Sequence, residues 1–402
     1  MAKNIIYHID VNSAFLSWTA CKILEENPNA VDIRTIPSAI CGDPAKRHGI
    51  ILAKSTPAKK YGVVTAEPIQ QALRKCPMLQ LFPSEYHYYA DRSYDFMELL
   101  RKYAPVVEPF SVDEAFCDMT GTEKLYGDPV EFAYKLKDEI RDTLGFTVNI
   151  GISENWLLAK MASDFQKPDR VHTLFPEEVP QKMWPLPVED LLFVGKSTSA
   201  ALRKMGIRTI GDLAKTDEAI LTARFKSMGN TMHRYANGVD VSSELSSVSH
   251  DVERKGYSHS VTVPEDIIDA AKAKQVILAL CETVAAKLRR DGVKAGTIAV
   301  GITNCEFSKS SKQAKLYSAT DTTQKIYETS VQLFDELWDH SPIRLLRVAA
   351  TNLGNEAEQF DLFDMGKSEK LKKLDRAIDC IRNRYGDDSV MRASFVEKEQ
   401  ED

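Results

Sequence analysis

Ser111-Val112-Asp113-Glu114-Ala115-Phe116-Cys117-Asp118 places two adjacent carboxylates inside a largely apolar segment. Val112 and Phe116 favour extended structure, so the pattern predicts a strand over 111–118. Burying neighbouring carboxylates costs free energy unless a cation compensates them. A hard divalent ion such as Mg²⁺ is the usual compensation, because it binds carboxylate oxygens and keeps places for water and phosphate. An isolated Asp-Glu pair, by contrast, is more often a solvated strand end.

A second segment, Asn4-Ile5-Ile6-Tyr7-His8-Ile9-Asp10-Val11-Asn12-Ser13-Ala14-Phe15, changes this balance. It predicts an apolar strand that reaches Asp10 and is followed by a helix over 13–25. If the two strands are neighbours, Asp10, Asp113 and Glu114 form a cluster of three carboxylates. Such a cluster can hold two metal ions about 3.5–4 Å apart, the arrangement that polymerases and nucleases use for in-line phosphoryl displacement.

Three ordered blocks carry a resemblance to a known family. The chain resembles the Y-family translesion DNA polymerases in three places. The first is D-V-N-x-A-F at 10–15 and the second is S-V-D-E-A-F-x-D at 111–118. The third block contains I-G-I-S-E-N at 150–155 and K-P-D at 167–169. The resemblance covers roughly residues 4–365. It implies an error-prone, lesion-bypassing enzyme without proofreading, which adds dNTPs to the primer 3′ end of primer-template DNA with two Mg²⁺ ions.

The resemblance also implies roles for individual residues. Asp10, Asp113 and Glu114 would be the catalytic carboxylates and, with the Val11 carbonyl, would hold both metal ions. Phe15 would be the steric gate, an aromatic ring placed where the 2′-hydroxyl of a ribonucleotide would sit. Contacts to the nucleotide are expected from Ser13, Ala14, Phe15, Lys54, Ser55, Thr56, Lys59 and Lys167. Lys160 is either a further triphosphate contact or a surface lysine.

Residues 54–62 read as a helix with Pro57 in its first turn and Gly62 at its end. A helix N-terminus with nearby lysines suits triphosphate oxygens. Thr56 and Lys59 depart from the pattern A-N-Y-x-A-R of the polymerase IV branch and are closer to the catalytic subunits of the polymerase V branch. The branch, the lesions bypassed and any need for accessory subunits therefore stay open.

The order of predicted elements indicates an α+β multidomain protein with the right-hand architecture of polymerases. A ferredoxin-like palm is expected over 1–25 and 83–175, with small fingers over 26–82 that begin with a strand at 33–40. A helical thumb with a helix-hairpin-helix follows over 176–242, and a Ser-rich linker over 243–252. A little finger of β-α-β-β-α-β order, with a long helix over 266–290, occupies 253–354. Residues 355–402 form a tail.

Two short segments suggest macromolecular contacts. Gly195, Lys196 and Ser197 stand where a helix-hairpin-helix usually has G-x-G, so one glycine is missing, and they are expected to bind DNA phosphates. A plain αα-hairpin is the alternative. In the tail, Gln359, Phe360, Leu362 and Phe363 belong to a Q-[LF]-x-L-F peptide, which resembles the segment with which bacterial polymerases dock into their sliding clamp. Packing of this segment on its own domain is the alternative.

Composition sets outer bounds. The 402 residues suggest two to four domains. The net charge of −6 is unusual for a nucleic-acid binder, but residues 355–402 alone carry nine basic and thirteen acidic residues. We expect no membrane span, because no run of about 18 apolar residues occurs. Seven scattered cysteines without C-x-x-C pairs favour a reducing cytoplasm and argue against zinc. A monomer is expected.

Two other functions compete with polymerisation. A non-catalytic relative that binds DNA or the clamp would need a broken carboxylate set, whereas this chain keeps all three. A two-metal nuclease would explain the carboxylates, but it would leave Phe15, the helix at 54–62 and the clamp peptide without a role.

Overall fold

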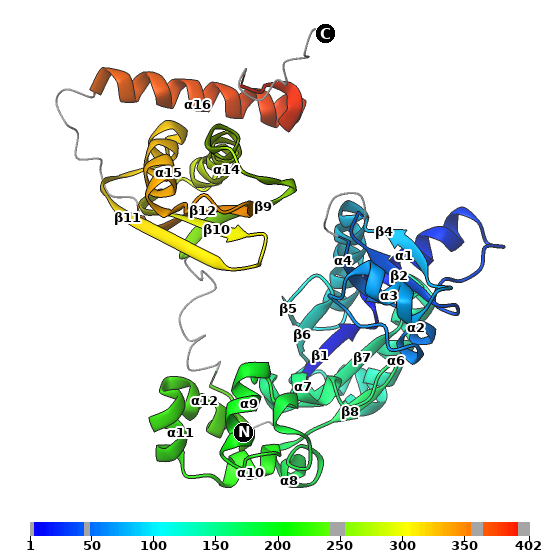
Figure 1. The fold of residues 1–402 in the computed structure, drawn as a ribbon. Helices are drawn as coiled ribbons and strands as arrows, with labels where there is room; N and C mark the ends of the chain where they lie inside the picture. Colours follow the sequence, from blue (N-terminus) through cyan, green and yellow to red (C-terminus); the bar gives the residue numbers. More distant parts are fainter. Residues whose placement is uncertain (1–3, 44–48, 242–253, 355–364, 393–402) are drawn as a thin grey trace. The chain divides into compact units, whose positions relative to one another are not determined.

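The computed structural model describes residues 4–43, 49–241, 254–354 and 365–392, which belong to two compact units (Figure 1). The first unit comprises the described residues up to 241, and the second begins at 254. Each has its own hydrophobic core. No helix in these ranges is long and apolar enough to span a membrane.

The first unit is built on a five-stranded sheet in the order β5-β6-β1-β7-β8. β1 lies at its centre, fully buried, and pairs antiparallel with both β6 and β7. The first four strands of this order have the ferredoxin-like arrangement predicted for the palm, with β8 added parallel to β7. The strands are β1 (Ile6–Val11), β5 (Val106–Pro109), β6 (Glu114–Asp118), β7 (Val148–Ser153) and β8 (Val171–Thr173).

The two faces of β1 serve different purposes because side chains alternate along a strand. Tyr7, Ile9 and Val11 point into the main core. Helices α1 (Ala14–Glu26), α4 (Tyr86–Arg101) and α6 (Pro129–Leu144) contribute to the same core. His8 and Asp10 alternate with these apolar residues and are therefore on the opposite face of the sheet.

That opposite face is covered by α7 (Trp156–Ser163), which lies against β1 and β7. Gly151 of β7 explains the closeness, since a Cβ there would meet the Ala159 carbonyl oxygen at 2.1 Å. Asn155 caps the helix by accepting a hydrogen bond from the Leu158 N–H at 2.8 Å. The tight contact brings Lys160, on α7, to the side of the sheet that carries Asp10.

A small sheet of order β3-β2-β4 lies with two short helices in the region predicted as the fingers. Its elements are β2 (Ser38–Cys41), β3 (Ile51–Lys54), α2 (Thr56–Lys60), α3 (Ile69–Lys75) and β4 (Gln80–Pro83). The strand predicted over 33–40 is wrong at its start. Asp32 accepts hydrogen bonds from the backbone and side chain of Arg34, which makes a turn before Ser38.

Short helices α8 (Val179–Lys182), α9 (Lys196–Lys204), α10 (Ile210–Lys215), α11 (Glu218–Phe225) and α12 (Ser227–Ala236) form the predicted thumb region. They enclose a separate core. Leu157, Leu158 and Met161 of α7 belong to this core, so one helix packs against both the palm sheet and the thumb.

The second unit has the predicted β-α-β-β-α-β order, and its sheet order is β11-β10-β12-β9. The helix predicted over 266–290 begins at Ala270, because β9 continues to Ile267 and Asp269 caps the helix through the Lys272 N–H. The elements of the second unit are β9 (Gly256–Ile267), α14 (Ala270–Arg290), β10 (Lys294–Asn304), β11 (Lys309–Thr320), α15 (Thr323–Leu337), β12 (Ile343–Gly354) and α16 (Met365–Tyr385).

Helix α16 packs against the rest of the second unit through charged groups. Arg289 of α14 contacts Asp375 at 3.3 Å and Asp379 at 2.6 Å. Asp375 also accepts the backbone N–H of Thr323 at 2.9 Å, and so caps α15 from another helix. Glu282 of α14 pairs with Arg382 at 3.0 Å. The helix is therefore held by a polar cluster.

Candidate active site

Asp10 and Glu114 are direct partners in the antiparallel ladder between β1 and β6. Asp113 lies one residue before β6, so the prediction of a strand over 111–118 is wrong in its first three residues. Ser111 donates a side-chain hydrogen bond to Asp113 at 2.6 Å, and the Phe110 N–H donates to the Glu114 carbonyl at 2.9 Å. The Val11 N–H donates to the Asp113 carbonyl at 3.0 Å, which places the turn beside β1.

Two lysines contact the carboxylates. Lys167 Nζ lies 2.5 Å from Asp10 Oδ2 and 2.8 Å from Asp164 Oδ1. Lys160 Nζ lies 3.0 Å from Glu114 Oε1, 3.9 Å from Asp10 Oδ2 and 3.6 Å from Asp164 Oδ2. Lys160 is only 8% exposed, so the alternative of a surface lysine is wrong.

The two facing carboxylates have opposite pKa shifts. Burial raises the pKa of Asp10 to about 6, and Lys167 and Lys160 only partly offset this effect. For Glu114, burial again favours the neutral form, but the contacts with His8 and Lys160 prevail and lower its pKa to about 2. Glu114 is therefore firmly ionised, whereas Asp10 gains a proton more readily.

His8 belongs to the site, although no sequence motif marks it beyond its place in the strand. Its side chain is fully buried, with Nε2 3.4 Å from Glu114 Oε2. Ser163 donates its hydroxyl to the Lys160 carbonyl at 2.8 Å, so it accepts from His8 Nδ1, also at 2.8 Å. Burial lowers the pKa of His8. The imidazole therefore lies between the Glu114 carboxylate and α7, and its hydrogen bond is with Ser163.

A pocket of about 270 Å³ brings most of the predicted residues together. It is lined by Asp10, Val11, Ser13, Ala14, Phe15, Leu52, Ala53, Lys54, Lys59, Thr65 and Asp113. A second cavity of about 190 Å³ shares Asp10, Val11, Ser13 and Lys59 with it. Ser55, Thr56 and Lys167 line this second cavity. Glu114 lines neither cavity, because its carboxylate faces Lys160 and His8.

The lysines from the fingers suit an anionic ligand. Lys54 donates to Thr65 Oγ1 at 3.0 Å, and burial together with the charge of Lys59 lowers the pKa of Lys54. An anion between two such ammonium groups would relieve their repulsion. Ser55 plays a different part, since its hydroxyl accepts the Ala58 N–H at 3.1 Å and donates to the Ile36 carbonyl at 2.7 Å. Its side chain is committed to capping α2.

Asn12 is a second residue whose role was not foreseen. Its Oδ1 accepts hydrogen bonds from Thr147 Oγ1 at 3.0 Å and from the Asp169 N–H at 2.8 Å. Its Nδ2 donates to Asn149 Oδ1 at 3.1 Å. Asn149 in turn donates to the Gln166 carbonyl at 2.7 Å. This network fixes the segment that carries Lys167 against the end of β1.

The carboxylates offer ligand chemistry suited to a hard divalent ion. Asp10, Asp113 and the Val11 backbone bring oxygen atoms to one pocket from neighbouring chain segments. In the part of the chain that the structure describes, no three Asp, Glu, His or Cys side chains converge closely enough to hold an ion. The reason is visible at Glu114 and Asp113, whose carboxylates contact Lys160 and Ser111 instead. The donor set fits a metal once these contacts are exchanged.

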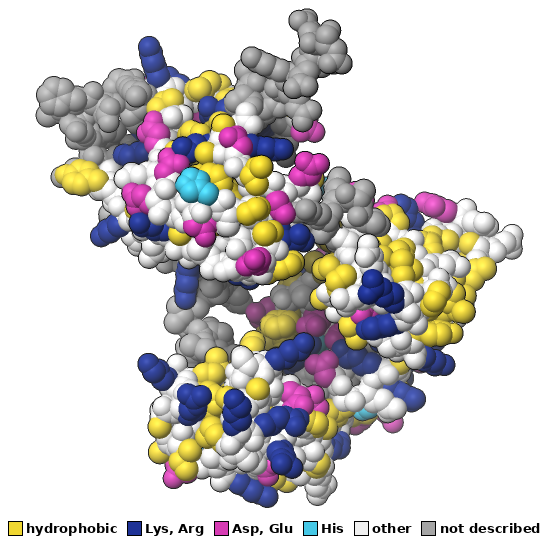
Figure 2. All heavy atoms as spheres, in the orientation of Figure 1, with side chains coloured by type: hydrophobic (Ala, Val, Ile, Leu, Met, Phe, Trp, Pro, Cys, Tyr) yellow, Lys and Arg dark blue, Asp and Glu magenta, His cyan; other side chains and the backbone are white. Residues whose placement is uncertain are grey.

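In the thumb, Gly195 is the N-cap of α9, and Lys196 and Ser197 are its first exposed residues. The turn before them contains Phe193 at φ +68°, a conformation that favours glycine. The structure therefore indicates that Phe193, and not Ser197 as predicted from the sequence, stands where the hairpin motif usually has a glycine. Figure 2 shows Lys and Arg side chains spread over the visible face of these helices. The clamp peptide lies outside the described residues.

Comparisons with known proteins agree on one family. The sequence pattern of the impB/mucB/samB family matches residues 9–164, its C-terminal domain matches 254–362, and its helix-hairpin-helix motif matches 176–207. DNA polymerase IV of Clostridium acetobutylicum is 44% identical over 99% of this chain and 100% of its own length. DNA polymerase IV of Clostridium kluyveri is 34% identical over 98% of each chain. A solved Y-family DNA polymerase chimera of Dbh and Dpo4 has the same fold, with a TM-score of 0.69 and 23% identity over 87% of this chain and 99% of its own.

Proposed function

This chain belongs to the impB/mucB/samB family of Y-family DNA polymerases, and from this premise we propose which residues bind metal, nucleotide and DNA. It is a DNA-directed DNA polymerase of the translesion type, with DNA and dNTPs as substrates. The observation that carries the proposal is the shared pocket in which Asp10, Val11 and Asp113 meet Phe15 and the lysines of the fingers.

For the chemical step, we assign Asp10, Asp113, Glu114 and the Val11 carbonyl to two Mg²⁺ ions. These residues would hold the ions, whose chemistry, when bound, would be to lower the pKa of the primer hydroxyl and to neutralise the charge of the triphosphate and the leaving pyrophosphate. Asp10 must be ionised to act as a ligand. Because its pKa is raised to about 6, metal binding below about pH 6 requires that the Asp10 carboxyl group first lose its proton.

The nucleotide is held by the side chains around the carboxylates. Lys54 and Lys59 bind the triphosphate, Thr56 and the backbone of Ser13 and Ala14 line its path, and Lys167 exchanges its contact with Asp10 for phosphate oxygens. The Phe15 ring lines the same pocket and excludes a 2′-hydroxyl. Since Lys59 is a point charge, its phosphate contact carries less directionality than an arginine fork.

Primer-template DNA is bound by at least two other surfaces. The first turn of α9, Gly195 to Ser197, offers backbone N–H groups to a phosphate. On the second unit, the sheet face opposite the helices has exposed small and basic residues. Arg347 pairs across the ladder with Ser260 and Gly301, and Ser311 continues the row on β11. These residues suit sequence-independent contacts with the DNA backbone.

The domain assignment follows the same logic. We propose the palm over 1–25 and 83–175, fingers over 26–82, thumb over 176–242, linker over 243–252 and little finger over 253–354. We further propose that the tail binds a sliding clamp through Gln359, Phe360, Leu362 and Phe363. A monomer working in the cytoplasm accords with these roles.

Primer extension on one labelled hairpin tests the function. The purified chain with Mg²⁺ and dNTPs should lengthen the hairpin, and EDTA should stop the reaction. Shortening would indicate a two-metal nuclease. DNA binding without any change in length would indicate a non-catalytic relative.

A further inference from the structure

Lys160 is a buried cation among three carboxylates. Its ammonium lies within 4 Å of Glu114, Asp10 and Asp164, and its closest contact is with Glu114 at 3.0 Å. Lys160 as a whole is 8% exposed, and it lies on α7, a helix of eight residues. Burying an ammonium is costly, and it is tolerated where opposite charges compensate it.

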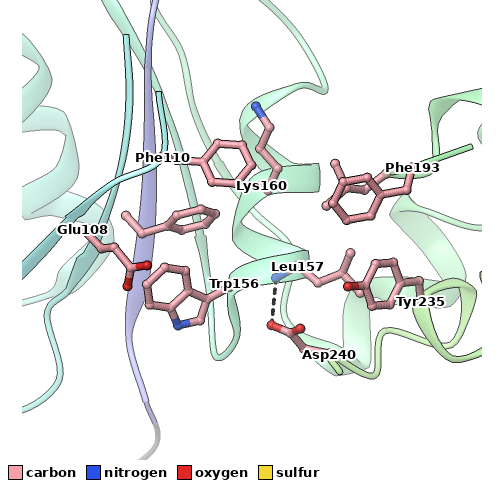
Figure 3. Close-up of a pocket in the computed structure, with 10 residues that line it drawn as sticks. Glu108, Phe110, Trp156, Leu157, Lys160, Phe193, Tyr235 and Asp240 are labelled. Atoms are coloured by element: carbon pink, nitrogen blue, oxygen red, sulfur yellow. Dashed lines mark hydrogen bonds between the residues drawn. The ribbon is translucent and has the colours of Figure 1, made fainter. Parts of the chain in front are cut away.

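The backbone fixes where this ammonium can reach. Gly151 lets α7 approach the sheet to van der Waals distance, and the Lys160 carbonyl is itself held by the Ser163 hydroxyl. The stem of Lys160 lines an apolar cavity of about 260 Å³, together with Phe110, Phe116, Trp156 and Phe193 (Figure 3). Apolar surroundings on one side and carboxylates on the other direct the charged end toward Glu114.

Electrostatics make this contact relevant to metal binding. Glu114 and Asp10 are two of the three side chains proposed to bind the metal, and Lys160 places a unit positive charge 3.0 Å from Glu114 and 3.9 Å from Asp10. A cation in that position stabilises the two carboxylates when no metal is bound. The same cation repels a divalent ion that binds to them.

We propose that Lys160 is a resident counter-cation of the metal-free polymerase, which holds Glu114 away from the pocket and sets the divalent-ion concentration at which the site loads. The inference rests on the proposed function of Asp10 and Glu114 as metal ligands. It concerns the state before catalysis, in which Lys160 is a positioning residue for Glu114.

The test measures metal binding directly, without DNA or dNTP. We would titrate Mn²⁺ into the full chain by calorimetry, follow free Mn²⁺ by electron paramagnetic resonance, and record thermal unfolding in EDTA and in Mn²⁺. K160M should bind Mn²⁺ at least about tenfold more tightly, because a competing charge has gone. It should also unfold at a lower temperature in EDTA, since the carboxylates lose their partner, and recover more stability than wild type on adding Mn²⁺.

Two controls separate this effect from general changes. K160R keeps a positive charge and should bind Mn²⁺ as wild type does. K135M removes the same charge from an exposed position on α6 and should leave both affinity and melting unchanged. Equal or weaker Mn²⁺ binding by K160M, with K160R behaving alike, would overturn the counter-cation role while leaving the metal site intact. Failure of wild type and every variant to bind Mn²⁺, even with primer-template and dNTP added, would overturn the metal site itself.

Discussion

The rings of Phe15 and Tyr89 lie parallel, with 4.5 Å between their centroids and 10° between their planes. Tyr89 is buried, and its hydroxyl lies 2.9 Å from the hydroxyl of Thr19. Phe15, at the first turn of α1, is thus supported from behind by a ring that has little freedom. Phe15 also lines the pocket that contains Asp10 and Asp113.

We predict that Phe15→Ala admits ribonucleotides, because the space of the 2′-hydroxyl is no longer filled. Discrimination between matched dNTP and rNTP should fall by at least about tenfold, equivalent to about 1.4 kcal/mol. Single-nucleotide insertion kinetics measure it, with Phe307→Ala, an exposed aromatic of the second unit, as control. An unchanged ratio would return Phe15 to a packing role.

Asp113→Ala should abolish nucleotide addition while DNA binding and thermal stability persist. The side chain is only partly buried, and among the described residues its hydrogen bond is with the nearby Ser111 hydroxyl, so folding depends little on it. Loss of a metal ligand removes several kcal/mol of transition-state stabilisation, and extension should fall below about one per cent of wild type. Higher residual extension would exclude Asp113 from the metal site.

Asp10→Asn should stabilise the metal-free chain at pH 7 while eliminating activity. The pKa of Asp10 rises on folding from 3.8 to about 6, mainly through burial, so the ionised group opposes folding at pH 7 by as much as about 3 kcal/mol. This opposition is complete above about pH 6 and disappears below about pH 4. The melting advantage of the variant in EDTA should shrink over the same interval. If the variant unfolded at a lower temperature than wild type at pH 7, ionised Asp10 would stabilise the fold, and the prediction would be wrong.

Arg289→Met should weaken the docking of α16. The substitution leaves Asp375 and Asp379 without the guanidinium that contacts both, and Asp375 is 5% exposed. Leaving buried charge unpaired costs about 3 kcal/mol. Calorimetric melting of the full chain should show the loss in the second unit alone, whose core is separate from those of the first unit. Lys373→Met, which removes an exposed ion pair with Glu369, should have little effect.

Leu362→Ala combined with Phe363→Ala should remove stimulation by the sliding clamp without changing distributive synthesis. The reason is that a short peptide binds through a few apolar anchors, so two truncations suffice. Primer extension with and without loaded clamp measures the effect. Earlier melting together with retained stimulation would show that the segment packs on its own domain.

The predictions from sequence were most accurate where periodic patterns coincide with clear caps. The helix expected over 54–62, with Pro57 in its first turn and Gly62 at its end, is observed over Thr56–Lys60, where Ser55 caps it and Gly62 follows at φ +77°. The turn at 111–113 was missed because Val112 favours strands, whereas a side-chain hydrogen bond between Ser111 and Asp113 competes with the ladder.

Parts of the site depend on contacts between distant residues, and no local pattern reveals them. His8 meets Ser163 across 155 positions, and Asn12 meets Asp169 across 157. Lys160 could be read either way from the sequence, since only the close approach of α7 at Gly151 determines that it is buried. Motifs located the carboxylates, but tertiary packing decided which cations face them.

Because Asp10 and Glu114 pair directly in the ladder, a molecule is active only if β6 and β1 are in the correct register. If β6 slipped by one residue against β1, Ala115 would face Asp10 and Glu114 would turn into the apolar side occupied by Ile9. An ionised carboxylate there would cost several kcal/mol, so misregistered chains should not persist as compact molecules. A preparation that loses activity through misfolding should therefore contain fewer working enzymes, each with a normal rate constant, and active-site titration would count them.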